Sequence, residues 1–211
     1  MRRKIIILLI LGILLTIGII GINHRKVIVC LDAGHGGKDV GAVAENGNRQ
    51  EKEDNLKLVL KVKEYLEKQG IKVILTRKDD TYVTLNKRCQ IANFGKADVF
   101  VSMHRNSAKS GNGVEIWRSQ KEGEVSEKLA KDILENLEKV GIQNNRGVKE
   151  GMSEESNTDY FVNRNTKMPS CLVELGFITN EKDNQLLDEK LNQYAEAIAK
   201  GILQNLEEKR K

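Results

Sequence analysis

The stretches Val27-Ile-Val-Cys-Leu-Asp-Ala-Gly-His-Gly-Gly37 and Asp98-Val-Phe-Val-Ser-Met-His104 decide the fold. Each begins with a short apolar run rich in β-branched residues, which is typical of a buried parallel strand. Each run leads to a histidine, His35 or His104. In open α/β sheets, sites form beyond the carboxyl ends of the strands. The pattern therefore predicts that two imidazoles meet at one sheet edge, where they could share a metal ion.

Strand-like and helix-like segments alternate outward from these two stretches. Strands are predicted at 26–31, 71–76, 98–103, 113–118, 160–162 and 170–175. Helices are predicted at 52–69, 85–94, 126–140, 181–187 and 191–206. This alternation predicts a single three-layer α/β domain with a largely parallel sheet of about six strands.

Glycines and polar segments separate these elements. Gly70 and Gly141 fit positions just past helix ends, and Ser126 fits an N-cap. Loops are predicted at 42–50, 109–112 and 143–158. The last is long and polar, so we expect either a mobile lid or a surface excursion.

The first residues predict membrane attachment. A short tail at 1–4 precedes a segment without charge from Ile5 to Ile22, which would span roughly 27 Å as a helix. We expect a transmembrane anchor that stays uncleaved rather than a cleaved secretory signal, because the run is long and Asn23-His-Arg-Lys26 follows it. Basic residues flank both ends, so the positive-inside rule is nearly balanced. We place the N-terminus inside and the domain 27–211 outside.

Composition limits the partners. Hydrophobic residues make up 39% of the chain, which is ordinary for a domain with a core. Aromatics are only 4%, which argues against nucleic-acid platforms built on base stacking. The net charge of +5 fits either an anionic partner or a solvated lysine-rich surface. The cysteines, at 30, 89 and 171, have no CxxC spacing, so no disulfide framework is expected.

The two histidines suggest a catalytic zinc site. Such sites usually have three protein ligands and an open position for water. His35 and His104 supply two ligands, whereas His24 adjoins the apolar segment. The third would be a carboxylate or a cysteine. Reasoning from the residues alone does not choose among the nearby carboxylates, Asp32, Asp39, Glu45, Glu51 and Glu53.

Glu174 is the best candidate for a base that activates water. It lies in the otherwise apolar run Ser170–Phe177, where a charged group without a partner is costly. Burial would raise the pKa of its carboxyl and a nearby cation would lower it, so the group could exchange a proton near neutral pH. The alternative is an ion pair with Arg77 or Arg88.

Other motifs fit less well. His35-Gly-Gly37 is similar to an oxyanion loop of lipases, but the chain has no Gly-x-Ser-x-Gly elbow. The glycines at 34, 36, 37 and 41 match neither the dinucleotide nor the Walker pattern. Nucleotide binding is therefore not expected.

Four stretches together resemble one family. They are Leu31-Asp-Ala-Gly-His-Gly-Gly-Lys-Asp-Val-Gly41, Glu51-Lys-Glu-Asp-Asn-Leu56, Val99-Phe-Val-Ser-Met-His-Arg-Asn106 and Arg164-Asn-Thr-Lys-Met-Pro-Ser-Cys-Leu-Val-Glu-Leu-Gly-Phe-Ile-Thr-Asn180. In this order they resemble the motifs of the zinc-dependent N-acetylmuramoyl-L-alanine amidases (the Amidase_3 type). The resemblance covers about 27–206.

The resemblance implies an activity and a site. It implies zinc (Zn²⁺) held by His35, Glu51 and His104, with Glu174 as the catalytic acid and base. The reaction would be hydrolysis of the amide between the lactyl group of N-acetylmuramic acid and L-alanine of the peptidoglycan stem peptide. Substrate contacts are not assigned by the sequence. Asn106 and Arg88 are the candidates, although Arg88 fits a structural ion pair equally well.

Three residues depart from the family pattern. Ala33 stands where proline is frequent, and Asn163 stands where an apolar residue is common. Arg105 replaces a small or apolar residue next to His104. We expect Arg105 to point to solvent, the alternative being contact with an anionic substrate group.

Function and location are linked, because peptidoglycan lies outside the cytoplasmic membrane. The resemblance therefore implies a single-pass protein of the bacterial cell membrane with its domain on the wall side. The layout resembles sporulation-type amidases, which act in the spore cortex with a deacetylase; an activator, if there is one, is not identified. Two alternatives are a non-catalytic peptidoglycan-binding regulator with this fold and a zinc peptidase that cuts within the stem peptide.

Overall fold

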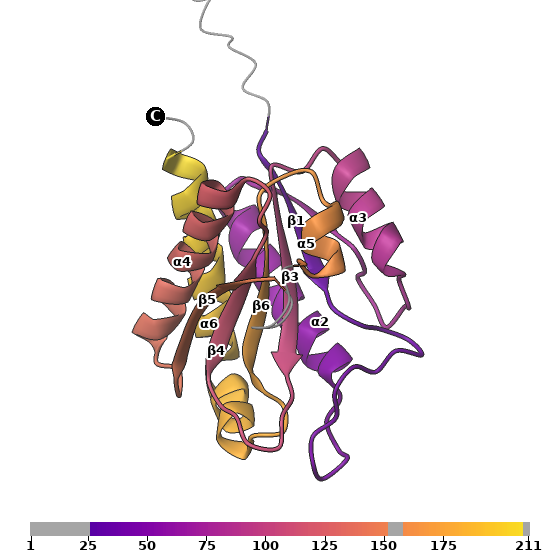
Figure 1. Cartoon of the computed structure of the whole chain (residues 1–211), viewed down its shortest axis with the longest axis vertical. Coiled ribbons are helices and arrows are strands. Elements are labelled where there is room, and N and C mark those ends of the chain that lie inside the picture. Colours follow the sequence, from indigo (N-terminus) through magenta and orange to yellow (C-terminus); the bar gives the residue numbers. More distant parts are fainter. Residues whose placement is uncertain (1–25, 152–157, 209–211) are drawn as a thin grey trace, which may run out of the picture.

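The computed structural model describes residues 26–151 and 158–208 (Figure 1). The predicted tail and anchor at 1–22 lie outside the described residues. Within the described ranges, no helix has both the length and the apolarity needed to cross a membrane.

Six strands form one sheet, in the order β2-β1-β3-β6-β4-β5. The strands are β1 (Ile28–Ala33), β2 (Lys72–Leu75), β3 (Val99–Asn106), β4 (Val114–Arg118), β5 (Asn145–Glu150) and β6 (Ser170–Phe177). Strands β2, β1, β3 and β6 are parallel to one another. Strand β4 is antiparallel to β6, and β5 is parallel to β4. The prediction of a single α/β domain with six, mostly parallel strands is confirmed.

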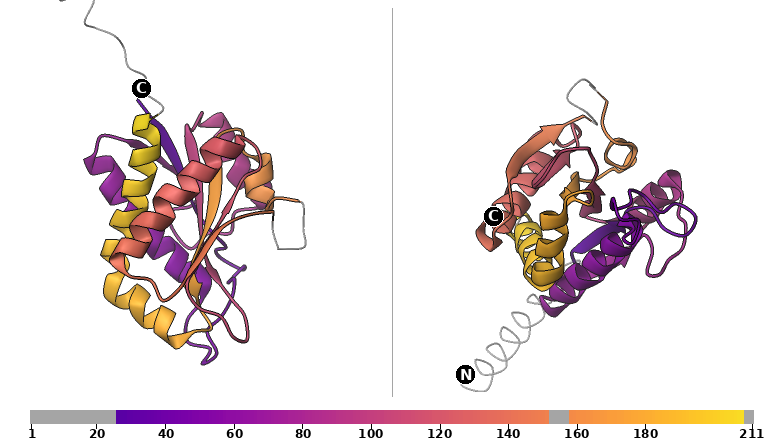
Figure 2. Two further views of the ribbon diagram at one scale, coloured as in Figure 1. Left: turned by 60° about the vertical axis from the view of Figure 1, so that its left-hand side comes forward. Right: turned by 90° about the horizontal axis from the view of Figure 1, so that it is seen from below.

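Helices cover both faces of the sheet. One face carries α2 (Glu51–Lys68), α4 (Gly123–Val140) and α6 (Glu181–Glu208), with α4 and α6 side by side in Figure 2. The other face carries the shorter α3 (Leu85–Phe94) and α5 (Phe161–Asn165). The result is the three-layer arrangement that the alternating sequence predicts.

Alternation along the central strands divides the core in two. In β1, Val29 and Leu31 pack beneath the long helices, whereas Cys30 between them belongs to the cluster beneath α3 and α5. Phe100 in β3 likewise joins the smaller cluster. Successive side chains of a strand point to opposite faces, so strands that are apolar at every position supply both cores.

Two predicted elements are wrong. The predicted loop 143–158 contains strand β5, whose burial is only partial, so its polar sequence lacks the apolar signal of a central strand. The predicted strand 160–162 instead begins helix α5. That helix is short, and Asn163 ties it to the sheet by donating a side-chain hydrogen bond to the Trp117 carbonyl at 2.9 Å. A tertiary bond of this kind leaves no pattern in the sequence.

The predicted helix ends are mostly accurate. Gly70 and Gly141 follow α2 and α4 with φ of 76° and 95°, conformations that favour glycine. A break at Lys190 divides α6 near the predicted gap between its two halves. Ser126 is not an N-cap, because α4 begins at Gly123. Its hydroxyl instead donates to the Lys121 carbonyl and accepts from the Ser170 N–H, joining α4 to β6.

Candidate metal centre and catalytic cleft

Three parallel strands deliver the predicted site residues to one edge of the sheet. His35 follows β1, His104 lies near the end of β3, and Glu174 lies in β6 directly opposite His104 in the pairing register. Glu51 is the first residue of α2, which starts at the same edge. Residues far apart in the sequence therefore meet because the strands share one direction.

Close backbone approach explains two of the glycines around His35. A Cβ on Gly34 would lie 2.3 Å from the His104 ring, and one on Gly41 would lie 2.6 Å from Glu51 Oε2 and from the His35 ring. His35 itself has φ of 59°, an uncommon conformation outside glycine. The loop is thus folded tightly around the two imidazoles.

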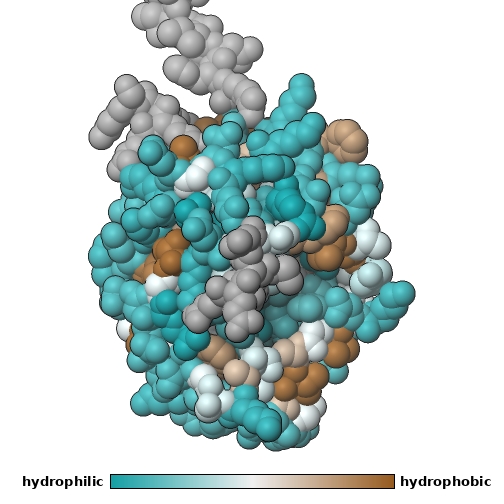
Figure 3. Space-filling model, viewed as in Figure 1, coloured by the Kyte–Doolittle hydropathy of each residue, from teal (hydrophilic) through white to brown (hydrophobic). Residues whose placement is uncertain are grey.

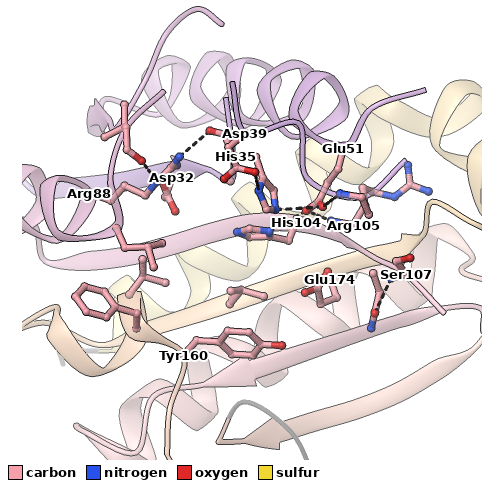
Figure 4. A pocket seen from close by; sticks show the side chains of 18 of the residues that line it. Asp32, His35, Asp39, Glu51, Arg88, His104, Arg105, Ser107, Tyr160 and Glu174 are labelled. Carbon is pink, nitrogen blue, oxygen red and sulfur yellow. Dashed lines mark hydrogen bonds and ion pairs between the residues drawn. The ribbon is translucent and has the colours of Figure 1, made fainter. Parts of the chain in front are cut away.

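The side chains of His35, Glu51 and His104 form one cluster (Figure 4). One potential ligand atom from each lies within 4.8 Å of the others. Nε2 of His35 is 3.2 Å from Glu51 Oε2, and Nδ1 of His104 is 2.8 Å from Glu51 Oε1. The histidine rings meet edge to face at 4.9 Å between centroids.

Neighbouring groups orient this cluster. Asp39 accepts a hydrogen bond from His35 Nδ1 at 2.9 Å, which directs Nε2 of that ring toward Glu51. Glu51 Oε2 accepts from the Ala42 N–H at 2.8 Å, and Oε1 accepts from the Arg105 N–H at 3.1 Å and the Asn55 amide at 3.2 Å. Such outer contacts fix ring orientation in metal sites.

The cluster is strongly coupled electrostatically. Burial opposes the charge of Glu51, but hydrogen bonds with His104 and His35 outweigh it and hold the pKa of Glu51 far below its usual range. Burial alone would lower the pKa of His104, but the hydrogen bond with Glu51 raises it to about 9. A metal cation bound among these atoms would displace the proton from each ligating histidine nitrogen. It would also neutralise the negative charge of Glu51.

The donor set fits zinc. Two imidazole nitrogens and one carboxylate oxygen are a known three-ligand set of catalytic zinc, with the fourth position open. Tetrahedral ligands at the usual bond lengths lie about 3.3 Å apart, and the His35–Glu51 pair has a separation of 3.2 Å. Asp39 already holds His35 by a hydrogen bond, and Asn55 holds Glu51, as the outer hydrogen-bond partners of metal ligands do.

Glu174 lies next to the cluster as a buried carboxylate with an unused oxygen. Its Oε2 has no hydrogen-bond partner among the described residues. Burial raises the pKa of Glu174 to about 7, with His104 lowering it and Glu51 and Glu115 raising it. The alternative partners are bound elsewhere, because Arg77 donates to backbone carbonyls and Arg88 pairs with Asp32.

A cleft of about 410 Å³ opens over these groups. The three cluster residues and Glu174 line it together with an apolar side that includes Tyr82, Leu85, Tyr160 and Phe161. Figure 4 shows Tyr160 and Glu174 facing the cluster across this space. The reactive groups are therefore accessible to a ligand while most of their surface is covered.

The other candidate carboxylates lie outside the cluster formed by His35, Glu51 and His104. Asp32 is buried beneath the site, bonded to Arg88 at 2.7 Å, to Ser102 and to Thr76. Asp39 contacts His35 as described. Glu45 and Glu53 are exposed. The structure therefore brings Glu51 into the cluster with the two histidines, and its role as a metal ligand stays a prediction.

The predicted substrate residues differ in availability. Arg88 lines the cleft, but it donates to Asp32 and to the carbonyls of Val83, Ala33 and His35. Those bonds fit the structural alternative. Asn106 also lines the cleft, and its amide donates to Glu115 at 2.9 Å. Contact of either residue with substrate stays a prediction.

Glu115 is a site residue that the sequence reasoning missed. It pairs in register with Glu174, so the two carboxylates occupy neighbouring strands. Arg146 and Lys149 of β5 neutralise it at 2.7 and 3.3 Å, and Trp117 donates to it. An isolated glutamate in the apolar run Val114–Arg118 was the available signal.

The expectation that Arg105 points to solvent is wrong. Its side chain is only 1% exposed and pairs with Asp54 at 2.5 Å. It also donates to the Asn184 side chain at 2.8 Å. Arg49 contacts both Asp54 and Asp188, so this series of ion pairs joins α2, β3 and α6. Alternate residues of a strand face opposite sides, which turns Arg105 away from the side of His104.

The fold and the cluster together define the class: a three-layer α/β protein with a His-Glu-His group suited to a metal ion. Comparison with known proteins gives the family. A family model described as N-acetylmuramoyl-L-alanine amidase (Amidase_3) matches residues 29–204, and the chain belongs to this family.

Several relatives and solved structures support this membership. The chain is 42% identical over 193 residues to the endolysin of Bacillus phage SPP1, covering 87% of this chain and 68% of that one. A crystal structure of an N-acetylmuramoyl-L-alanine amidase from Clostridium difficile 630 is 34% identical with a TM-score of 0.80, covering 87% and 98%. The CwlD amidase from Clostridioides difficile, solved with the GerS lipoprotein, is 33% identical with a TM-score of 0.78, covering 86% and 99%.

Proposed function

We propose that the chain is a zinc-dependent N-acetylmuramoyl-L-alanine amidase. It hydrolyses the amide between the lactyl group of N-acetylmuramic acid and L-alanine in peptidoglycan. Membership of the amidase family supports the reaction. The observation that carries the assignment of residues is the position of Glu174, whose unpaired oxygen lies in the same cleft as His35, Glu51 and His104.

The three cluster residues would hold the zinc ion. When bound, zinc supplies a Lewis acid for the scissile carbonyl and lowers the pKa of a coordinated water to about 7. His35 and His104 contribute neutral nitrogens, and Asp39 keeps His35 in the required tautomer. Glu51 contributes negative charge from the first turn of α2.

Glu174 carries the proton in this proposal. Its pKa of about 7 in the metal-free site is close to neutral pH, which suits a group that must both accept and release a proton. Glu174 first takes a proton from the attacking water as the water oxygen bonds to the lactyl carbonyl carbon. It then gives that proton to the nitrogen of L-alanine as the C–N bond breaks, which leaves a lactyl carboxyl group and a free L-alanine amino group.

The test uses the full-length chain, measuring bound zinc and release of stem peptides from peptidoglycan by mass spectrometry. We expect about one zinc per chain, because three ligands define one site. Glu174→Gln should retain zinc and lose roughly 10²- to 10⁴-fold in rate, the usual contribution of a general acid–base group. Release at the native rate would contradict the role of Glu174.

A matched pair of variants tests the ligand role. Glu51→Gln should lose zinc and activity, whereas Glu53→Gln, two positions along the same helical turn but exposed, should keep both. Equal zinc content in the two variants would refute Glu51 as a ligand. Products that retain L-alanine on the glycan would indicate a peptidase, and binding without cleavage would indicate a regulator.

We also propose the cellular arrangement. The apolar segment Ile5–Ile22 would anchor the chain in the cell membrane, with domain 27–211 on the wall side. The likeness to CwlD supports a protein partner of the same kind as its lipoprotein. A role in sporulation belongs to this proposal because a single anchor directly before the domain resembles the layout of sporulation-type amidases. Flotation of the full-length chain with vesicles tests the anchor independently of peptide release.

A further inference from the structure

The edge of the sheet opposite the cleft, where the parallel strands begin, carries a set of exposed basic side chains. Lys26 precedes β1, and Lys72 begins β2, where its N–H bonds to the Val27 carbonyl at 3.1 Å. The Asp98 N–H bonds to the Ile28 carbonyl at 2.7 Å, which places the segment between α3 and β3 beside the start of β1. Figure 1 shows the ends of α2 and α3 at this same upper end of the molecule.

Six exposed residues define what we call the tether edge: Lys26, Lys68, Lys72, Phe94, Lys96 and Lys167. Phe94 is 82% exposed, more than any other large hydrophobic side chain described. Figure 3 shows an apolar spot at the upper end of α3 within a mostly hydrophilic face. Asn93 joins this end of α3 to the backbone of Asn165 and Lys167, at 3.0 Å each.

Nearby acidic groups offset the lysines only in part. Asp98 and Glu67 are two carboxylates beside the five lysines of the tether edge. The part of this edge beyond β4 is mixed in charge, with Lys121 followed by Glu122 and Glu124. The basic and apolar character is therefore concentrated at the ends of α2 and α3 and the start of β1.

The sequence brings this edge close to the proposed anchor. Three residues, Asn23 to Arg25, lie between Ile22 and Lys26 of the tether edge, so the two Cα atoms are at most about 14 Å apart. The headgroup layer occupies roughly 5 to 7 Å of that distance. The remaining gap is about one Debye length at physiological salt, so the lysines would lie within the field of an anionic surface.

We infer that the tether edge rests on an anionic lipid bilayer, with Phe94 inserted among the headgroups and the lysines against lipid phosphates. This inference rests on the proposed anchor and not on the amidase assignment. An exposed aromatic ring beside lysines suits an interface that is apolar inside and negatively charged outside. The cleft, at the far edge of the sheet, then faces away from the membrane.

The experiment uses two tryptophan variants of the full-length chain, placed in vesicles that contain phosphatidylglycerol and phosphatidylcholine brominated near the headgroup. Phe94→Trp reports the tether edge. Leu85→Trp is the matched control, because it is 53% exposed and lies at the other end of α3. The wild type, with Trp117 as its single tryptophan, gives the background.

We expect brominated lipid to quench the emission added by Phe94→Trp and to leave that added by Leu85→Trp unchanged. Equal quenching of both, or of neither, in a chain that floats with the vesicles would overturn the inference while leaving the anchor intact. A chain that does not float would overturn both. Peptide release from soluble wall fragments reports the amidase separately.

Charge-reversal variants provide a second test of the inference. Lys72→Glu with Lys167→Glu should reduce the quenching of Phe94→Trp, and replacing phosphatidylglycerol with phosphatidylcholine should do the same. Lys109→Glu with Lys182→Glu makes the same change in net charge on exposed residues near the cleft edge, and it should have no effect. Equal effects of the two pairs would show a response to net charge alone and contradict a specific surface.

Discussion

At the scale of single residues, the sequence predicted which side chains would meet but not how each is supported. The apolar strands and their terminal histidines were enough to place His35 and His104 together. Choosing Glu51 among five carboxylates required the family resemblance, because that choice depends on where α2 starts in space. Glu115 and the inward turn of Arg105 depend on side-chain direction and were not predicted.

Burial of the Glu174 carboxyl should lower the free energy of unfolding of the metal-free protein by an amount that depends on pH. The pKa of this carboxyl is about 7 in the folded state and 4.5 in its ordinary state. Between these values the unfolded chain releases a proton that the folded chain retains, so stability falls as pH rises. Glu174→Gln removes this cost. The gain in stability should therefore be larger at pH 7.5 than at pH 5, and constant above about pH 8.

Urea unfolding of chelator-treated protein at the two pH values measures this difference. Saturation with zinc should shrink it, because a nearby cation favours the charged carboxylate. A gain independent of pH would mean that the environment does not raise the pKa of Glu174.

At the scale of elements, regular patterns were predicted well and irregular ones were not. Long helices with an apolar side, such as α2 and α4, and fully buried strands, such as β6, have periodic signals. Strand β5 lies at the sheet edge with half-buried polar residues, and α5 is a single short helix. Both are held by tertiary contacts that a sequence pattern does not contain.

The packing of α4 against α6 gives a prediction at this scale. A Cβ on Gly201 would lie 2.5 Å from the Ile133 backbone, so the two helices approach closely there. Gly201→Ala should force them apart and cost about 1 to 3 kcal/mol, as overpacked cores do. The nearest atom to a Cβ on Gly123, at the start of α4, is 3.9 Å away. Gly123→Ala is therefore the control.

The midpoint of urea unfolding measures both alanine variants. We expect a lower midpoint for Gly201→Ala only, with zinc content unchanged because the cleft is on another part of the sheet. Equal midpoints for the two variants would show that the helices can adjust without cost.

At the scale of the whole molecule, buried ion pairs add to the apolar core in joining the central sheet to the helices packed on it. Arg105 in β3 and Arg49 before α2 share Asp54, and Arg49 extends the contact to Asp188 in α6. This chain of ion pairs passes behind the metal cluster. It connects the helix that carries Glu51 to the strand that carries His104.

A double-mutant cycle tests this connection. Arg105→Met leaves the buried Asp54 with one partner fewer and should cost about 3 to 5 kcal/mol, as the loss of one member of a buried pair does. Asp54→Asn should then cost less in the Arg105→Met background than in the wild type, with a coupling of about 0.5 to 3 kcal/mol. Additive costs, measured by urea unfolding, would show that the contact contributes no coupling.

The length of the central strands has a consequence for where the enzyme can cut. Strand β3 runs the eight residues from Val99 to Asn106, and at roughly 3.3 Å per residue it separates the two ends of the domain by about 25 Å. In the proposed arrangement, with the tether edge on the bilayer, this distance would set a fixed working height. Polymerised glycan at that height would be within reach, whereas a wall precursor still attached to its lipid would lie too close to the bilayer to be cut.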